Sequence, residues 1–192
     1  MRQTMRFLKE FVTRPTSTGA IAPSSKYLAN RMVEWIDWPQ AQRVVEYGPG
    51  NGSFTGKIVA NLPVGAKFFA VELNHNLAVQ FRQQYPTVKL YEECVSNIAR
   101  LCEQEGMDQL DCVVSGLPWA GFNEELQTRL FEPMLKILKP GGQFVTFAYY
   151  NGVLLPAGQR FRRRLKASFT EVTTSSGVWI NLPPAFVYRC RK

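Results

Sequence analysis

A glycine-rich turn constrains what this chain can fold into more than any other feature. Residues 43–55 have the sequence Arg-Val-Val-Glu-Tyr-Gly-Pro-Gly-Asn-Gly-Ser-Phe-Thr. The apolar run of Val44 and Val45 is typical of a buried parallel strand, and it ends on Glu46. Glycines then turn the chain into a predicted helix, which Ser53 is placed to cap. A turn between a parallel strand and a helix is the usual ligand crevice of an open α/β sheet.

The glycines of this turn are Gly48, Gly50 and Gly52, and they follow Glu46. The resulting Glu-x-Gly-x-Gly-x-Gly pattern differs from the Gly-x-Gly-x-x-Gly pattern of dinucleotide-binding turns. Glycine tolerates positive φ and lets a ligand approach the backbone closely. An acidic residue before the glycines repels a pyrophosphate but suits a cationic amino group, such as that of S-adenosylmethionine. We therefore predict that Glu46 and the glycines hold the methionine part of that donor.

A second acidic residue occurs one βαβ step further along the chain. The apolar strand predicted at Phe68–Val71 ends on Glu72, which Leu73 follows. A carboxylate at this point can accept hydrogen bonds from both hydroxyls of a ribose. The sequence thus predicts a nucleoside site at Glu72 and Leu73, beside the glycine turn.

With these features in place, residues 44–150 resemble the class I S-adenosylmethionine-dependent methyltransferases. Enzymes of this kind often place an aspartate after the third strand, where it binds the adenine amino group. In this sequence that position is Cys94. The resemblance therefore assigns the adenine contact to Cys94, with Glu93 or a backbone group as the alternatives.

The rest of the chain alternates predicted strands with predicted helices. Further strands are predicted over residues 88–91, 110–114, 143–149, 169–174 and 185–190, and helices over residues 76–84, 96–105 and 124–138. This alternation predicts a doubly wound α/β fold. The resemblance makes it a mostly parallel seven-stranded sheet of the Rossmann-like methyltransferase type, with an N-terminal amphipathic helix.

Length and composition allow one domain. The chain has 192 residues, of which 45% are hydrophobic, so it can bury a substantial core. We expect an amphipathic helix over residues 1–14, a cap region over residues 15–40 and a catalytic core over residues 41–192. The sequence has no run of 18 apolar residues and no signal-peptide core at its start, so we expect a cytoplasmic protein without a transmembrane span.

The cysteines do not form a metal-binding pattern. The chain contains Cys94, Cys102, Cys112 and Cys190, without the paired spacing of zinc ligands. We expect reduced thiols that are buried or half-buried, and no bound metal.

The charge balance points to an anionic partner. The formal net charge is +8, which favours either nucleic acid or an anionic membrane surface. Residues 2–13 predict a basic amphipathic helix that either packs on the domain or lies in a membrane interface. Residues 160–166, beginning with Arg160, carry five cations in seven residues, which favours contact with an anion over a merely solvated face.

Two further stretches resemble bacterial phospholipid N-methyltransferases. They are Thr-Gly-Ala-Ile-Ala-Pro-Ser-Ser at residues 18–25 and Asn-Leu-Pro-Pro-Ala-Phe-Val-Tyr-Arg at residues 181–189. The resemblance implies methylation of the amine of phosphatidylethanolamine and of its partly methylated products. It also implies a peripheral position on the inner face of the cell membrane, with Arg160 and the cations after it near lipid phosphates.

The segment after the fourth predicted strand is where such enzymes normally hold the acceptor. The residues predicted to act there are Ser115, Gly116, Leu117 and Trp119. Their backbone carbonyls are expected to accept an amine N–H, and the Trp119 ring to favour a methylated ammonium through cation–π attraction. Tyr149 and Tyr150, at the end of the fifth predicted strand, are expected to add to this aromatic cage.

Two alternatives remain open. Ribosomal RNA adenine dimethyltransferases resemble this chain in the glycine turn but carry Asn-Leu-Pro-Tyr after the fourth strand. Gly116 stands in place of that asparagine and cannot accept from an adenine amino group, so the sequence disfavours a nucleic-acid substrate without excluding it. The other alternative is a donor-binding, membrane-associated protein without lipid methyltransferase activity.

Overall fold

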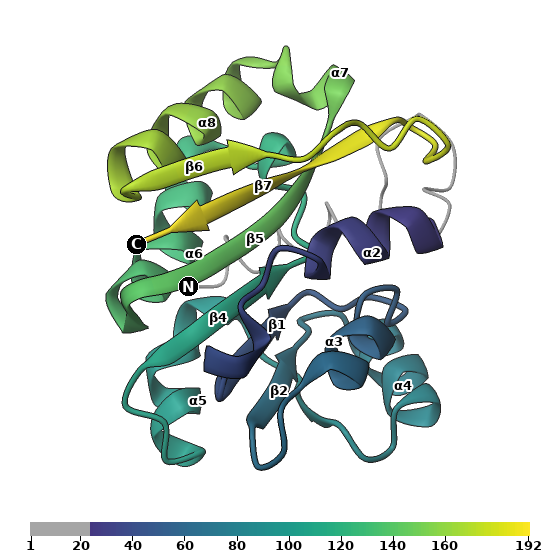
Figure 1. Ribbon diagram of the computed structural model, residues 1–192, viewed down its shortest axis with the longest axis vertical. Coiled ribbons are helices and arrows are strands. Elements are labelled where there is room, and N and C mark those ends of the chain that lie inside the picture. Colours follow the sequence, from purple (N-terminus) through teal and green to yellow (C-terminus); the bar gives the residue numbers. More distant parts are fainter. Residues whose placement is uncertain (1–23) are drawn as a thin grey trace.

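The computed structural model describes residues 24–192, and within them a seven-stranded sheet lies between two layers of helices (Figure 1). The strands are β1 (Arg43–Tyr47), β2 (Lys67–Val71), β3 (Lys89–Tyr91), β4 (Leu110–Ser115), β5 (Leu138–Tyr149), β6 (Glu171–Thr174) and β7 (Ala185–Arg191). Their order across the sheet is β3-β2-β1-β4-β5-β7-β6. The predicted helix over residues 2–13 lies outside the described residues.

The sheet is mostly parallel, as the sequence predicted, with antiparallel pairing at one side. Strands β1 to β5 run parallel, whereas β7 is antiparallel to both β5 and β6. The order of the strands reverses at β1, whose neighbours are β2 and β4. Tyr47, the last residue of β1, lies opposite Val71 of β2 and Ser115 of β4. The carboxyl ends of three strands therefore meet at one edge, which is the usual binding crevice of such sheets.

The helices predicted after the glycine turn and over residues 76–84, 96–105 and 124–138 are present, with small shifts at their ends, whereas those over residues 150–153 and 156–168 were not predicted. The helices are α2 (Lys26–Val33), α3 (Thr55–Asn61), α4 (His75–Gln84), α5 (Ile98–Gln104), α6 (Glu124–Ile137), α7 (Tyr150–Val153) and α8 (Pro156–Ser168). The hydroxyl of Ser25 caps α2 by accepting from the N–H of Leu28. In the part of the chain that the structure describes, no helix is long and apolar enough to span a bilayer.

Two expectations about element boundaries were wrong. Ser53 does not cap α3: the helix starts one residue later, with Phe54 at its N-cap and no side-chain bond there, and the Ser53 hydroxyl donates to Asn51. The glycine turn is thus one residue longer than predicted. Strand β5 starts at Leu138, directly after α6, and a register shift in its pairing with β4 accommodates the Pro-Gly-Gly that was expected to precede it.

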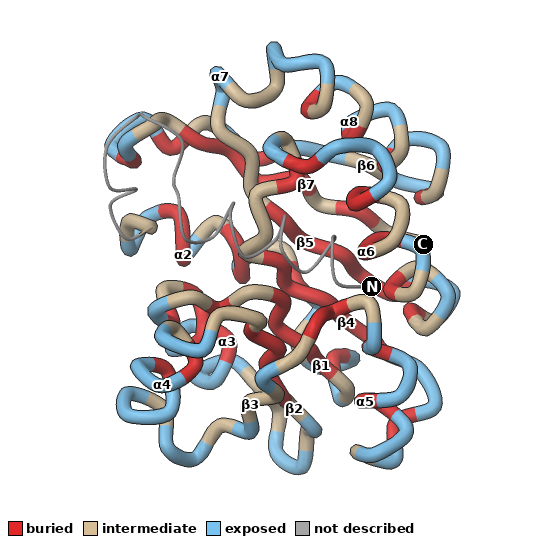
Figure 2. The backbone as a smooth tube through the Cα atoms, turned by 180° about the vertical axis from the view of Figure 1, so that it is seen from behind, coloured by how far each residue is buried: buried red, intermediate tan, exposed pale blue. Residues whose placement is uncertain are grey.

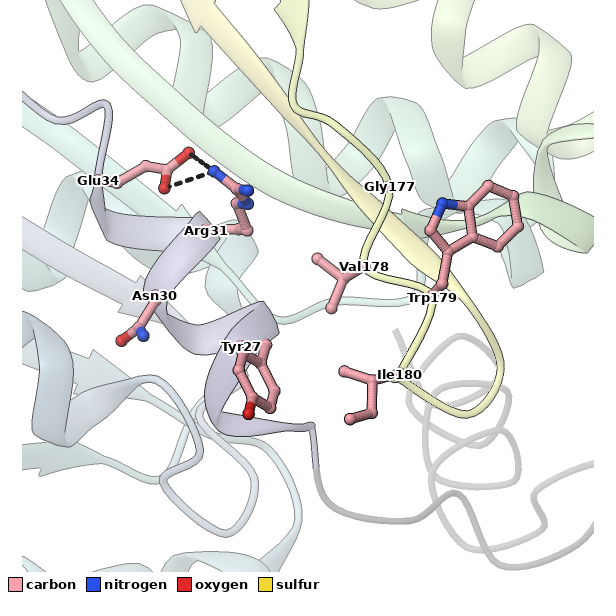
Figure 3. A pocket seen from close by; sticks show the side chains of 8 residues that line it. All are labelled: Tyr27, Asn30, Arg31, Glu34, Gly177, Val178, Trp179 and Ile180. Carbon is pink, nitrogen blue, oxygen red and sulfur yellow. Dashed lines mark hydrogen bonds and ion pairs between the residues drawn. The ribbon is translucent and has the colours of Figure 1, made fainter.

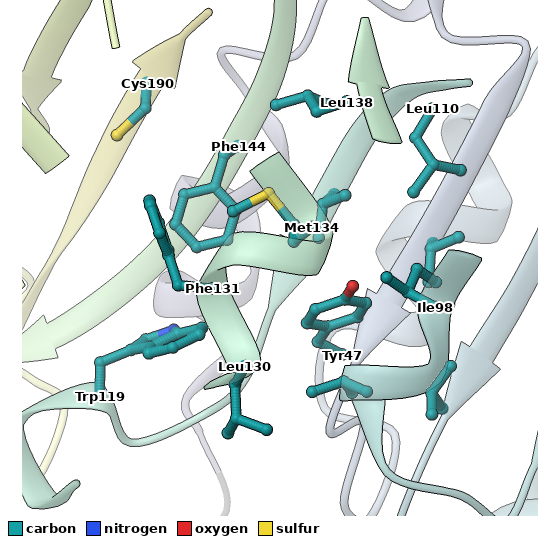
Figure 4. Close-up of a cluster of buried hydrophobic side chains, with 14 of the residues drawn as sticks. Tyr47, Ile98, Leu110, Trp119, Leu130, Phe131, Met134, Leu138, Phe144 and Cys190 are labelled. Atoms are coloured by element: carbon teal, nitrogen blue, oxygen red, sulfur yellow. The ribbon is translucent and has the colours of Figure 1, made fainter. Parts of the chain in front are cut away.

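The core has two apolar layers, one on each face of the sheet. Figure 2 shows that the buried residues are concentrated along the strands of the sheet. One layer joins the sheet to α5, α6 and α8 through a group of aromatic rings that includes Trp119, Phe131 and Phe144 (Figure 4). The other joins it to α2 and α3, through residues such as Met32 and Ile58. Each fully buried side chain of this size stabilises the fold by about 1.5–3 kcal/mol.

A buried carboxylate ties three strands together at the opposite edge of the sheet. Asp111 on β4 accepts hydrogen bonds from the backbone and guanidinium of Arg43, at 2.7 and 3.0 Å, and lies 2.6 Å from Nζ of Lys139. Burial alone would raise the pKa of Asp111, but the two cations outweigh it and hold that pKa below its usual value. The ionised carboxylate therefore stabilises the folded state.

We predict that Asp111→Asn lowers the free energy of unfolding by about 2 kcal/mol near neutral pH, the typical cost of losing hydrogen bonds to a charged group. Because the folded-state pKa is depressed, this stabilisation is lost as pH falls below about 4, so the two proteins should converge there. Urea denaturation at several pH values measures the effect. Asp108→Asn, which changes an exposed carboxylate nearby, is the control. Equal effects of both substitutions would contradict the prediction.

Candidate active site

The three glycines of the turn have different surroundings, although all have positive φ. A Cβ built on Gly52 would lie 2.2 Å from a ring carbon of Tyr85, and one built on Gly48 would lie 2.7 Å from Cδ2 of Leu117. A Cβ built on Gly50 would meet nothing within 4 Å. Gly48 and Gly52 are thus required by packing within the protein, whereas Gly50 leaves open space that a ligand can approach.

Glu72 connects the glycine turn to the end of β2. Its side chain is buried, and its two oxygens accept from the backbone N–H of Gly50 at 3.1 Å and of Asn74 at 2.8 Å. Burial raises the pKa of Glu72, although these backbone bonds act in the opposite direction. Each carboxylate oxygen can still accept a further hydrogen bond. The arrangement fits the predicted contact with two ribose hydroxyls.

Glu46 is fully buried beneath the turn. One of its oxygens accepts from the hydroxyl of Thr55 at 2.7 Å, and within residues 24–192 the other, Oε1, has no hydrogen-bond partner. Burial raises the pKa of Glu46 to about 8, the Thr55 bond opposes this shift, and the negative charge of Glu72 adds to it. A buried acceptor without a partner is costly, and an ammonium group would satisfy it. Thr55 was not predicted, although its place in the first turn of the helix after the glycines is a usable signal.

Gly116 lets the end of β4 approach the glycine turn directly. Its N–H donates to the carbonyl of Tyr47 at 2.7 Å, and a Cβ built on it would lie 2.5 Å from the carbonyl oxygen of Gly48. Leu117 packs against Gly48 from the same segment. A side chain at position 116 would therefore clash with the glycine turn. This steric reason for Gly116 is separate from the absence of an amide side chain noted in the sequence. Contact of Gly116 and Leu117 with an acceptor stays a prediction.

The prediction for Trp119 was wrong. Only 2% of its surface is exposed, and its ring stacks on Phe161 with the centroids 4.7 Å apart and the planes 4° apart. Its indole N–H donates to the hydroxyl of Ser115 at 3.0 Å, and the carbonyl of Ser115 accepts from the hydroxyl of Thr146. Trp119 thus belongs to the aromatic core and offers no free face to an ammonium group. Ser115 is fully buried and orients it.

The other predicted donor and acceptor residues lie along the same edge of the sheet. Cys94 follows β3, is 9% exposed, and accepts from the hydroxyl of Ser96 at 3.1 Å. Leu73 is half-buried against the core. Tyr149 ends β5 and packs edge-on against Phe147, and burial raises its pKa. These placements agree with a site at the strand ends, and the residues' contacts with ligands stay predictions.

The basic segment on α8 divides into two sets. Arg160 is half-buried, with Nε 3.9 Å from a carboxylate oxygen of Glu124, and Arg164 donates to the hydroxyl of Thr128 at 2.6 Å. Arg162, Arg163 and Lys166 are exposed. Since a helix turns 100° per residue, only part of a run of cations can face a partner. We therefore expect lipid contact at the exposed neighbours of Arg160 and not at Arg160 itself.

The cysteines are buried, as the sequence predicted, and free. Burial raises the pKa of the Cys102 and Cys190 thiols to about 12. In residues 24–192, no group of three or more histidine, cysteine, aspartate or glutamate side chains is placed to hold a metal ion.

Two segments that carried the sequence resemblance meet in the structure. The N–H of Ser25, just before α2, donates to Oδ1 of Asn181 at 3.0 Å, and the amide nitrogen of Asn181 donates to the carbonyl of Pro183. Asn181 lies in the loop between β6 and β7 and is 3% exposed. The hydrogen bond thus fastens the start of α2 to that loop, at the same edge of the sheet as the glycine turn.

Comparisons with solved structures identify the class of this fold. An O-methyltransferase from Bacillus cereus in complex with SAH superposes with a TM-score of 0.69 at 15% identity, covering 99% of this chain and 90% of that one. The O-methyltransferase TomG from Streptomyces achromogenes, in complex with SAM, gives 0.63 at 18% identity, covering 99% and 88%. The fold is therefore that of the class I S-adenosylmethionine-dependent methyltransferases.

Comparison of sequences identifies a family within this class. No family model matches the chain. An ornithine lipid N-methyltransferase from Singulisphaera acidiphila is 34% identical over an alignment of 194 positions, which covers 100% of this chain and 97% of that protein. The chain therefore belongs to the bacterial lipid N-methyltransferases of the class I fold, for which S-adenosylmethionine is the methyl donor. The resemblance seen in the sequence is confirmed at this level.

We predict that the buried carboxyl of Glu46 makes the protein less stable as pH rises. Its folded-state pKa is raised from 4.5 to about 8, so the unfolded chain releases this proton first and stability falls between those two values. Glu46→Gln keeps an acceptor for Thr55 and should remove most of the decline, leaving the smaller part due to Glu72. Urea denaturation between these pH limits tests it. An unchanged decline in the variant would contradict the assignment.

Trp119→Ala should lower the free energy of unfolding by about 3–5 kcal/mol, because it opens a cavity among stacked rings. Trp179→Ala removes an exposed ring and should change stability by no more than about 0.5 kcal/mol. Thermal and urea denaturation of both variants provide the comparison. If Trp119→Ala instead kept wild-type stability and lost only lipid methylation, the ring would have to face the acceptor.

Proposed function

We propose that this protein transfers methyl groups from S-adenosylmethionine to the terminal amine of ornithine lipid. The observation that carries the proposal is the match to an ornithine lipid N-methyltransferase over the whole of this chain, at 34% identity. A relative of this identity that spans both the donor-binding half and the C-terminal strands supports a shared acceptor more strongly than a match to the donor half alone.

The residues beneath and beside the glycine turn fit the donor. Glu46 has an unpartnered buried oxygen that suits an ammonium group, and Glu72 has room on both oxygens for ribose hydroxyls. Gly50 leaves the approach to the turn open, and Gly48 and Gly52 hold its shape. When bound, the donor supplies an electrophilic methyl group on a sulfonium. Leu73 and Cys94, which follow β2 and β3, would border its nucleoside part.

The chain contributes alignment to the reaction. An amine attacks a methyl group only as the neutral base and in line with the departing sulfur, so positioning is the principal requirement. Gly116 and Leu117 lie directly against the glycine turn and would border the reacting amine. The absence of an amide side chain at Gly116 leaves nothing there to recognise adenine, which counts against an RNA substrate.

Phosphatidylethanolamine is a second candidate acceptor. Residues 18–25 and 181–189 resemble phospholipid N-methyltransferases, and in the structure the two segments are joined by the hydrogen bond between Ser25 and Asn181. Both lipids present a primary amine close to an anionic group, a carboxylate in ornithine lipid and a phosphodiester in phosphatidylethanolamine. An edge with exposed cations suits either one.

Turnover of labelled S-adenosylmethionine on vesicles tests the proposal. We expect methylation of vesicles that contain ornithine lipid, at a higher rate than of vesicles that contain phosphatidylethanolamine, and no methylation of ribosomal RNA. The reverse order of the two lipids would establish the second candidate. Turnover on RNA alone, or donor binding without turnover on any lipid, would overturn the proposal.

The variant Glu72→Ala tests the predicted donor site. It should weaken the binding of S-adenosylmethionine by about 30-fold, because about 2 kcal/mol of charge-assisted hydrogen bonding to the ribose is lost. Calorimetric titration measures this directly. Wild-type donor affinity in the variant would show that Glu72 only braces Gly50 and Asn74.

A further inference from the structure

Large apolar side chains are exposed in two loops that do not need them for packing. The loop between β6 and β7 exposes Trp179 by 69%, Ile180 by 65% and Leu182 by 73%. The connection between α7 and α8 exposes Leu154 by 77% and Leu155 by 52%. We name these five residues the apolar rim. Large apolar side chains that gather on a protein surface mark interaction sites.

Topology places both loops at the edge of the sheet that carries the glycine turn. The first follows the end of β6 and precedes the antiparallel β7, and the second follows the carboxyl end of β5. Tyr150, the first residue of α7, stacks on Trp179 with the ring centroids 4.9 Å apart and the planes 9° apart. Helix α7 therefore contacts the first loop through Tyr150 and leads directly into the second (Figure 1).

A shallow groove separates this surface from α2. It has a volume of about 410 Å³, with Tyr27, Asn30 and Arg31 of α2 on one side and the loop residues Val178 and Ile180 on the other (Figure 3). Tyr27 is half exposed, at 48%, so an aromatic ring also lies on the α2 side. Arg31 is paired with Glu34 at 2.9 Å, which makes this wall polar. The groove thus combines an apolar wall with a polar one.

Exposed cations lie on the two helices that adjoin the apolar rim and its groove. Arg162 and Arg163 lie on α8, which begins directly after Leu155, and Lys26 lies on α2 beside Tyr27. Cations close to exposed Trp, Ile and Leu side chains are typical of surfaces that lie in a membrane interface. The formal net charge of +8 adds a general attraction to anionic lipid.

We propose that the apolar rim, with Arg162, Arg163 and Lys26 around it, docks the protein on an anionic lipid bilayer. The inference deepens the proposed function and rests on it, since a lipid amine is fixed at the bilayer surface. Docking through this edge brings that amine to the same side of the molecule as the donor site. Trp179 lies at the level of the headgroups, and Ile180, Leu182, Leu154 and Leu155 enter the acyl boundary.

The test compares substitutions of exposed apolar residues at two places in the full chain. The rim variant carries Trp179→Ser, Ile180→Ser and Leu182→Ser. The control variant carries Val64→Ser, which removes a fully exposed valine in the loop between α3 and β2, at the opposite edge of the sheet. Melting temperatures confirm that both variants are folded.

Cosedimentation with vesicles in which about a third of the lipid is anionic measures docking. We expect the rim variant to bind at least about tenfold more weakly than wild type, because three apolar side chains are no longer buried in the interface. The Val64→Ser variant should bind like wild type. Added salt should weaken the binding of wild type further by screening the cations. Wild-type binding by the rim variant would overturn the proposal.

Two further measurements separate this proposal from the proposed function. The rim variant should keep its affinity for S-adenosylmethionine and its turnover on a monomeric short-chain aminolipid, while its turnover on vesicles falls. If wild type methylates no lipid but the rim variant still loses vesicle binding, docking stands and the proposed function fails. If sedimentation instead shows that the rim substitutions abolish self-association, the rim is an interface between copies of the chain and the docking proposal fails.

Discussion

The burial of two carboxylates at one turn is the constraint on which the rest of this structure depends. Glu46 and Glu72 lie at the ends of neighbouring strands, and both side chains are buried beside the glycine turn. Backbone N–H groups and the Thr55 hydroxyl offset part of the cost, but one oxygen of Glu46 remains unsatisfied. A site built this way is preorganised for a cationic ligand, whose charge would offset the burial that raises the pKa of both groups.

Packing around the turn explains why the surrounding residues can be so restricted. Gly48 is closed off by Leu117, Gly52 by Tyr85, and Gly116 by the backbone of Gly48. Three segments distant in sequence thus pack closely because these glycines carry no side chains. Two of the three glycines of the turn are thus required by contacts within the protein, and of the three only Gly50 opens onto free space.

Local patterns were enough to predict most of the fold, because strands, turns and helices here follow their own propensities and a standard topology. Glu46 and Glu72 could be selected as candidates from the sequence because their position at strand ends decides their surroundings. Trp119 was misjudged because its partners, Phe144 and Phe161, lie far away in the sequence, and only tertiary packing draws the ring inward. The same holds for Arg160, whose orientation on α8 depends on Glu124 of another helix.

The burial of every cysteine has a practical consequence for following this protein on its lipid. Thiols react as thiolates. The thiols of Cys102 and Cys190 are buried, and burial raises their pKa to about 12, far above neutral pH. Cys94 and Cys112 are also buried. A single cysteine introduced on an exposed loop would therefore be the one position that accepts a maleimide dye under native conditions. The wild-type sequence already provides a silent background for fluorescence or spin-label measurements that test the proposed docking on a bilayer.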